Sequence, residues 1–365
     1  MLSNNEKKDT HKSKIGGQAL FEGVMMRGIG KEAMAVRKKD GSIHIEVKEV
    51  PANKWYQKTL FVRGVFNFVL QMKNGYNYLM RSMEVSGFLD EEEDDKKKEK
   101  KIETTETAET TETVETTIPD ESEAVEEAAK DKKALDTFIG IIGMVLGVGL
   151  SVLLFMFVPN WVASTLNGLV EADLERFHSL IAGVIRILLF VGYMWVVSFM
   201  KEIRMTYEYH GAEHKTIAAY EAGEELNPDD VENVKKYPRF HPRCGTSFIF
   251  IVLAISILVY SILPIRPSNI VGYVDSLFGV EVSLGLANVI RTFLQILFLP
   301  VLVSISYEII KLAGRYDRNI IMRIVSAPGL ALQRLTTFEP NERQLQVAVS
   351  AMLPVIPQNK EEDKW

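Results

Sequence analysis

Four long apolar runs constrain this chain more than any other feature. The first, at 138–158, contains no charged residue in 21 positions and is long enough to cross a bilayer core of about 30 Å. The others lie at 179–200, 246–264 and 286–306. Helices buried in a soluble core rarely run this far without charge. The sequence therefore predicts four transmembrane helices.

The basic residues beside these runs predict how the chain is oriented. Segment 201–245 contains seven Lys or Arg residues and segment 307–323 contains four, whereas the other two connectors contain one each. Short loops rich in Lys and Arg stay in the cytoplasm, so we expect both termini and 201–245 to be cytoplasmic. The polar N-terminus has no signal-peptide pattern. These features predict a multi-pass protein of the cell membrane, with the bilayer as its partner.

The remaining sequence predicts a mainly α fold, with about four transmembrane helices and a small cytoplasmic α+β portion. Apolar residues alternate with polar ones around Asp40-Gly41, which predicts an N-terminal β-hairpin. The apolar core of the next predicted helical segment, at 61–72, is too short to span, so we expect it to be buried or at the membrane surface. The predicted organisation is a disordered N-terminus (1–14), a cytoplasmic hairpin with helices (15–89), an acidic disordered linker (90–133), transmembrane helices one and two (134–200), a cytoplasmic loop with a metal site (201–245), transmembrane helices three and four (246–306) and cytoplasmic C-terminal helices (307–365), which we expect in two pieces separated at Pro328-Gly329.

Charge is distributed unevenly along the chain. Residues 90–127 contain 17 acidic and 5 basic side chains, a net charge of −12, while the whole chain carries −6. The remainder is therefore basic, which suits a body beside an anionic cytoplasmic leaflet. The single cysteine, Cys244, excludes an intrachain disulfide and fits a reducing compartment.

The motif His210-Gly-Ala-Glu213-His214 carries the clearest chemistry. Residues four apart on a helix face the same side, so the two imidazoles could hold one metal ion. Glu213 would lie beside them as a general base. The H-x-x-E-H spacing is that of inverzincin metallopeptidases. A polar helix without a metal is the alternative.

Further ligands would decide the type of site. His241 and Cys244 follow in "FHPRCGTSF", although His241 could instead be an interfacial histidine and Cys244 a small buried residue. Glu308, at the end of the fourth apolar run, is a carboxylate candidate, and Glu202 and Glu22 are weaker ones. Four ligands would make a closed structural site, and three would leave a position for water. A thiolate with imidazoles favours zinc among divalent metal ions, while a carboxylate also admits iron or manganese.

Four segments of the chain carry a family resemblance. These are "IGGQALFEGVMMRG", "YHGAEHKTIAAYE", "HPRCGTSF" and "PGLALQRLTTFEPNERQLQVAVSAM". Together they resemble the YqhQ-like family of bacterial membrane proteins, a domain-of-unknown-function family commonly described as metal-dependent enzymes. The resemblance covers 15–90 and 135–353. It implies a multi-pass membrane protein and supplies no substrate.

The leading hypothesis is a metal-dependent membrane hydrolase with a cytoplasmic metal site. One alternative is a membrane scaffold in which zinc only fixes the 201–245 loop. Another is a transporter using Arg186, Arg291 and Gln295, although no inverted repeat supports it, and we expect both arginines to snorkel toward the membrane surface. The basic and aromatic run at 235–243 follows from positive-inside bias, so we expect no nucleic-acid binding.

Overall fold

The computed structural model describes residues 11–52, 54–88, 142–143, 145–169, 177–316, 319–359 and 362–363. The predicted acidic linker, 90–133, and most of the predicted disordered N-terminus lie outside these residues. Residues 11–14 are described and differ from the prediction of disorder, because Ser13 is fully buried. Its backbone N–H and its hydroxyl both donate to the Glu221 carboxylate.

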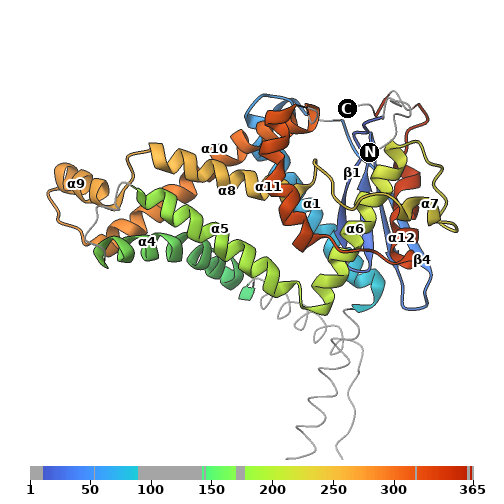
Figure 1. The fold of residues 1–365 in the computed structure, drawn as a ribbon, viewed down its shortest axis with the longest axis horizontal. Coiled ribbons are helices and arrows are strands. Elements are labelled where there is room, and N and C mark those ends of the chain that lie inside the picture. The colour runs from blue at the N-terminus through green and yellow to red at the C-terminus, as the bar shows by residue number, and fades with distance from the viewer. Residues whose placement is uncertain are drawn as a thin grey trace, which may run out of the picture. The chain divides into compact units, whose positions relative to one another are not determined.

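The elements follow one another along the chain as four strands and then helices (Figure 1). The strands are β1 (Gly16–Leu20), β2 (Gly23–Arg27), β3 (Lys31–Arg37) and β4 (Ile43–Glu49). The helical elements are the 3-10 turn η1 (Trp55–Gln57), α1 (Val62–Ser86), the π-helical turn η2 (Leu153–Phe157), α4 (Val158–Leu169), α5 (His178–Val197), α6 (Lys201–Glu221), α7 (Glu232–Lys235), α8 (Gly245–Ile262), α9 (Pro267–Phe278), α10 (Leu284–Arg315), α11 (Ile320–Thr336), α12 (Glu342–Met352) and the 3-10 turn η4 (Leu353–Val355).

The chain divides into two compact units. The first comprises Met1–Asp90, Phe190–Leu263 and Leu294–Trp365, and the second comprises Glu91–Leu189 and Pro264–Phe293. The sheet, α1, α6, α8, α11 and α12 belong to the first unit. Helices α5 and α10 contribute residues to both units.

The sheet is antiparallel with the order β1-β2-β3-β4. The pairing of Arg37 with Ile43 closes the β3–β4 hairpin around Asp40-Gly41, which confirms the predicted β-hairpin. Strands β1 and β2 lie in the glycine-rich segment before it, to which the sequence assigned no strand. They enlarge the hairpin into a sheet that can be covered on both faces.

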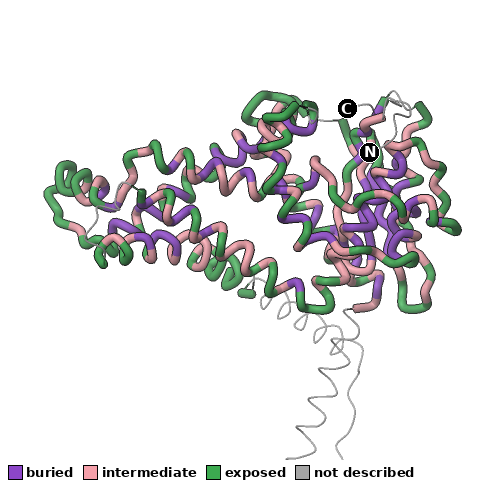
Figure 2. The backbone as a smooth tube through the Cα atoms, viewed as in Figure 1, coloured by how far each residue is buried: buried purple, intermediate pink, exposed green. Residues whose placement is uncertain are grey.

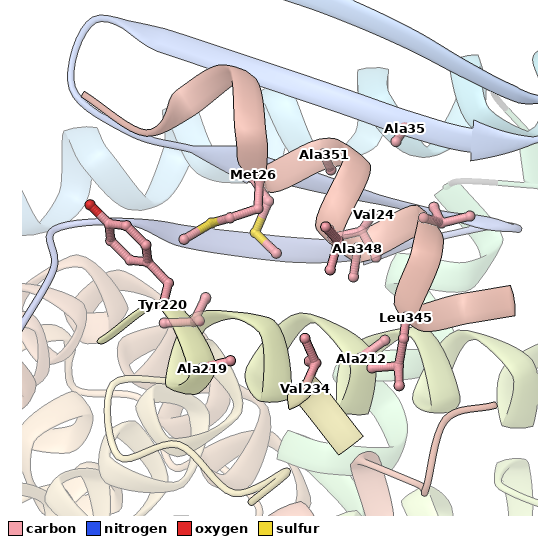
Figure 3. Close-up of a cluster of buried hydrophobic side chains, with 14 of the residues drawn as sticks. Val24, Met26, Ala35, Ala212, Ala219, Tyr220, Val234, Leu345, Ala348 and Ala351 are labelled. Atoms are coloured by element: carbon pink, nitrogen blue, oxygen red, sulfur yellow. The ribbon is translucent and has the colours of Figure 1, made fainter. Parts of the chain in front are cut away.

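The core of the first unit lies on the two faces of this sheet. Because successive side chains of a strand point to opposite faces, Val24 and Met26 join the cluster with α6 and α12 (Figure 3), whereas Met25 joins a smaller cluster with Tyr78 of α1. All of these side chains are buried, and Figure 2 shows that burial is concentrated around the strands, α6 and α12. The sheet thus holds α6, the helix of the H-x-x-E-H motif, on one face.

Four helices are long and apolar enough to cross a membrane. They cover Val145–Leu169, which includes η2 and α4, then His178–Val197, Gly245–Ile262 and Leu284–Arg315. Many of their side chains are exposed (Figure 2), as expected for surfaces that face lipid. The chain is therefore mainly α with four candidate spans and a small β portion, as the sequence predicts.

Two predictions about the helical part of the chain are wrong. The C-terminal segment does not break at Pro328-Gly329, because α11 continues through both residues to Thr336. A Cβ on Gly329 would lie 2.6 Å from the Ser247 side chain, so this point is a close contact between α11 and α8. Nor do Arg186 and Arg291 snorkel: both are buried, at 6% and 0% exposure.

Candidate metal centre

Helix α6 places the H-x-x-E-H motif in the middle of its length. It begins after the non-helical Met200 and ends at a left-handed Gly223. There the N–H groups of Gly223 and Glu224 donate to the carbonyls of Tyr220 and Ala219, a Schellman arrangement that satisfies the last turn. The motif lies about two turns inside this end.

The two small residues of the motif set its surroundings. A Cβ on Gly211 would lie only 2.0 Å from the carbonyl oxygen of Phe338, so the segment after α11 crosses directly over the helix at this position. The Phe338 N–H donates to the Tyr207 carbonyl in the same crossing. Ala212 is fully buried beside Leu345 of α12 (Figure 3). The motif is therefore enclosed by protein on several sides.

Backbone carbonyls fix both histidines of the motif. Nδ1 of His210 lies 2.8 Å from the Thr336 carbonyl oxygen, and Nδ1 of His214 lies 2.6 Å from that of Arg239. Because a carbonyl oxygen only accepts, each Nδ1 carries the proton. The two rings lie 4.4 Å apart between centroids. This tautomer leaves Nε2 of each ring as the atom able to bind a metal.

Cys244 completes a group of three ligand atoms. It is the N-cap residue of α8, and its Sγ lies 3.2 Å from His210 Nε2 and 3.2 Å from the Thr246 hydroxyl. One ligand atom each from His210, His214 and Cys244 lie within 4.8 Å of one another. We call this set the His₂Cys cluster. Imidazole and thiolate are the ligands that zinc prefers.

Electrostatics favours the metal-binding form of Cys244. Burial alone would raise the pKa of the thiol, but the neighbouring His210 and His214 outweigh it and hold the pKa well below its usual value. Burial likewise opposes a charged His210, yet the Cys244 thiolate, Glu213 and the Thr336 carbonyl together outweigh it and raise the pKa of His210 to about 9. The thiolate is the form that binds metals, and a bound cation would replace the proton that the thiolate holds on Nε2 of His210.

Glu213 lies beside this cluster, on the side of the sheet. Glu213 is 4% exposed, and its side chain lies against Gly17 in β1. A Cβ on Gly17 would lie 2.9 Å from the Glu213 side chain, so a bulkier residue in β1 would displace it. Burial raises the pKa of Glu213, while His214 and His210 oppose that rise. The carboxyl group can therefore hold a proton next to the cluster.

His241 flanks the cluster without joining the three ligand atoms. Its ring lies 5.5 Å from that of His214, and its Nε2 accepts from the Arg243 guanidinium at 3.1 Å. Burial and the charge of Arg243 hold the pKa of His241 well below its usual value. Gln333 of α11 hydrogen-bonds to both the N–H and the carbonyl of His241. The ring is thus fixed and neutral, with Nε2 already used.

The structure does not bring the carboxylate candidates to the cluster. Glu308 accepts from Arg63 through both oxygens, at 2.8 and 2.5 Å, and so joins α10 to α1. Glu22 accepts from the Tyr209 hydroxyl at 2.8 Å, and Glu202 is exposed in the first turn of α6. Glu308 was a candidate because it lies at the end of the fourth apolar run. That position gives no sign of Arg63, which is distant in the sequence and binds both carboxylate oxygens.

Thr336 is a site residue that sequence reasoning missed. Its carbonyl orients His210, while its own buried hydroxyl has no hydrogen-bond partner among the residues that the structure describes. A buried hydroxyl of this kind usually meets a water or a ligand. Its only signal in the sequence is its place in the segment "RLTTFEP". The donor set and the two oriented rings together fit a metal ion.

Comparisons with known proteins place the chain in a family. It matches the family described as "Protein of unknown function (DUF1385)" over residues 60–358, a range that includes the His₂Cys cluster, Glu213, His241 and Glu308. It is 29% identical over 341 residues to "Uncharacterized protein YqhQ" of Bacillus subtilis (strain 168), covering 92% of this chain and 90% of that protein. No solved structure gives a significant match. Because the family match spans most of its length, the chain belongs to the DUF1385 family of proteins of unknown function.

Proposed function

We propose that this protein is a metal-dependent hydrolase of the cell membrane. The observation that carries the proposal is the convergence of three ligand atoms, from the buried His214 and Cys244 and the half-buried His210, with a buried carboxyl group beside them. A three-ligand site keeps a position for water, as catalytic zinc sites do, whereas structural sites use four protein ligands. His241, the residue that could close the site, uses Nε2 to accept from Arg243.

His210, His214 and Cys244 would hold a divalent cation, with zinc favoured by the donor set. When bound, such a cation supplies a Lewis acid that lowers the pKa of water and polarises a carbonyl or phosphoryl oxygen. The carbonyls of Thr336 and Arg239 keep both imidazoles in the binding tautomer.

Glu213 would act as the general base. Its carboxylate oxygen would accept a proton from the attacking water and then pass it to the leaving group. The raised pKa of this buried carboxyl group suits such a transfer near neutral pH. Close packing against Gly17 would hold the side chain in place between the two transfers.

The site would face the cytoplasm at the membrane boundary. Cys244 immediately precedes α8, a candidate span. The 201–245 segment, which leads into the same end of that helix, contains seven Lys or Arg residues. Positive-inside bias supports a cytoplasmic placement of this segment and of both termini. A substrate could be a peptide, a lipid-linked group or a small polar metabolite.

A structural zinc site is the second candidate function. The cluster joins α6 to the start of α8, and the carbonyls of Thr336 and Arg239 bring the end of α11 and a loop to the same point. A scaffold of this kind would need the metal for folding and would not need Glu213.

Glu213→Gln separates the two functions. The purified variant in nanodiscs should keep its metal, measured by elemental mass spectrometry. Incubated with panels of peptides, phospholipids and small esters and amides, it should lose at least about 100-fold of the chelator-sensitive hydrolysis of the wild type, read by mass spectrometry. Glu202→Gln, an exposed glutamate on the same helix, is the matched control and should be fully active. Equal hydrolysis by wild type and Glu213→Gln would contradict a catalytic role and favour the scaffold.

A further inference from the structure

Within the part of the chain that the structure describes, helix α1 (Val62–Ser86) has one face packed against other elements and an opposite face that is exposed. The packed face carries Gly64, Gly75, Tyr78 and Ser82, all buried. A Cβ on Gly64 would lie 2.8 Å from the Ser304 Cα in α10, and the Tyr78 hydroxyl donates to Glu32 in β3 at 2.8 Å. The helix is therefore attached to a candidate membrane span at one end and to the sheet at the other.

The opposite face of α1 is an exposed apolar stripe. Its members recur every three or four residues and so lie on one side of the helix. They are Val62, Phe66, Val69, Met72, Tyr76 and Met80, each between 37% and 61% exposed. We call this set the α1 stripe. Trp55, in the turn before the helix, is 74% exposed. An exposed apolar surface of this length marks an interaction site.

The contacts of α1 with the candidate spans indicate what covers the stripe. Arg63 and Asn67 bond to Glu308 and Tyr307 of α10, just past the apolar run that ends at 306. Phe68 packs against Phe248 in the first turn of α8, 5.6 Å between ring centroids. Helix α1 thus contacts the ends of two candidate spans at the level where each would leave the hydrocarbon core.

The charge of this segment agrees with a lipid surface. Between residues 54 and 83 the chain contains five basic residues and no acidic one. Lys73 lies on the same side as the α1 stripe, between Val69 and Tyr76, where its long side chain can reach lipid headgroups. Aromatic residues such as Trp55 and Tyr76 favour the membrane interface. A basic amphipathic helix with such a face binds in the plane of an anionic bilayer.

We propose that α1 is an interfacial membrane helix, with the α1 stripe inserted at the headgroup and acyl boundary of the leaflet that α8 and α10 leave. The bilayer, rather than a second copy of the chain, covers this face. The inference is independent of the metal centre and of any catalytic activity. It makes α1 a fixed support that joins the spans to the sheet on which α6 packs.

Fluorescence quenching at two matched positions tests this placement. Val69→Cys puts a thiol on the α1 stripe, and Val47→Cys puts one on β4, where the valine is similarly exposed at 50%. Each variant is labelled with an environment-sensitive fluorophore in nanodiscs containing phosphatidylglycerol, with unmutated protein correcting for the buried Cys244. Met72→Cys is a second reporter on the stripe should Val69→Cys fail to fold.

Labels on the stripe should lose most of their emission to nitroxide-labelled lipids and be protected from aqueous iodide. The label at position 47 should show the opposite pattern. Iodide quenching on the stripe equal to that at position 47 would overturn the proposal, because the face would then be in water. Protection from both quenchers, together with disulfide cross-linking between Val69→Cys chains, would overturn it in favour of a second copy.

Discussion

Two buried polar groups in this protein use histidine in opposite ways. In the His₂Cys cluster of the first unit, backbone carbonyls take the outer nitrogens of His210 and His214, so the inner ones face the thiol. In the second unit, His178 is bonded at both nitrogens. Arg291 lies 2.5 Å from its Nδ1, and the Ser164 hydroxyl lies 3.0 Å from its Nε2.

The hydrogen-bond donors show what this difference means. A guanidinium only donates, so Nδ1 of His178 accepts, Nε2 donates to Ser164, and Ser164 hydrogen-bonds in turn to Asn288. We call these four residues the arginine network. Its histidine has both nitrogens satisfied within the network, whereas the His₂Cys cluster gathers three ligand atoms within 4.8 Å of one another. The arginine network suits packing between the candidate spans, and the His₂Cys cluster suits a ligand.

This contrast also bears on the transporter hypothesis. Arg186 donates to the Phe155 carbonyl in the π-helical turn η2, and Arg291 bonds to His178 and Ser179. Intramembrane charges mark transport pathways when they line a cavity. Here each arginine joins neighbouring helices, which supports packing rather than transport.

Removing Arg291 should give the largest loss of stability. Arg291→Leu removes the guanidinium that bonds to the buried His178 and the half-buried Ser179, and breaking a buried charged network costs about 3–5 kcal/mol. Chemical unfolding in mixed micelles would measure it, with the exposed Arg323→Leu as control. Metal content should not change. If Arg291→Leu lost its metal at temperatures where it remains folded, the arginine network and the His₂Cys cluster would not be energetically independent, which would contradict the comparison.

Gly211→Ala should have the next largest effect and should disturb the metal centre. Its Cβ would overlap the Phe338 carbonyl, and overpacking of this kind costs about 1–3 kcal/mol. The crossing segment would shift, and with it the Thr336 carbonyl that orients His210, so metal affinity should fall. Gly245→Ala is the control, because this glycine is next to Cys244 and no atom lies within 4 Å of the added Cβ. It should keep both the stability and the metal affinity of the wild type. Equal behaviour of the two variants would argue against the crossing.

Glu308→Gln should have the smallest effect. The Arg63 pair is partly exposed, with side-chain exposures of 19% and 16%, so its loss should cost about 1 kcal/mol. A double-mutant cycle with Arg63→Gln would isolate the pair. Metal content should stay at the wild-type value. A fall in bound metal would restore Glu308 as a ligand candidate and weaken the contrast with the His₂Cys cluster.

Sequence reasoning reached the features that depend on local patterns. Apolar length identified the four candidate spans, and alternation around Asp40-Gly41 identified the β3–β4 hairpin. Helical spacing paired His210 with His214, whose rings do lie together. Each of these depends on residues close together in the chain.

The features it missed depend on contacts between distant segments. Strands β1 and β2 were missed because their Gly-rich sequence has weak strand character, and pairing with β3 is what orders them. Helix α11 was divided at Pro328 because its packing on α8 is not visible in the sequence. The carbonyls of Thr336 and Arg239 were missed since any residue type supplies a carbonyl.

Metal content per chain tests the central claim most directly. Protein purified in detergent without added metal would be measured by elemental mass spectrometry as wild type and as four variants. We predict about one equivalent of zinc in the wild type, lost in His214→Ala and Cys244→Ala. It should be kept in His241→Ala and in His44→Ala, a control on β4 whose histidine bonds to Glu46. Loss in His241→Ala as well would indicate a closed four-ligand site and contradict the open centre. No metal in the wild type after reconstitution with zinc would contradict the metal centre itself.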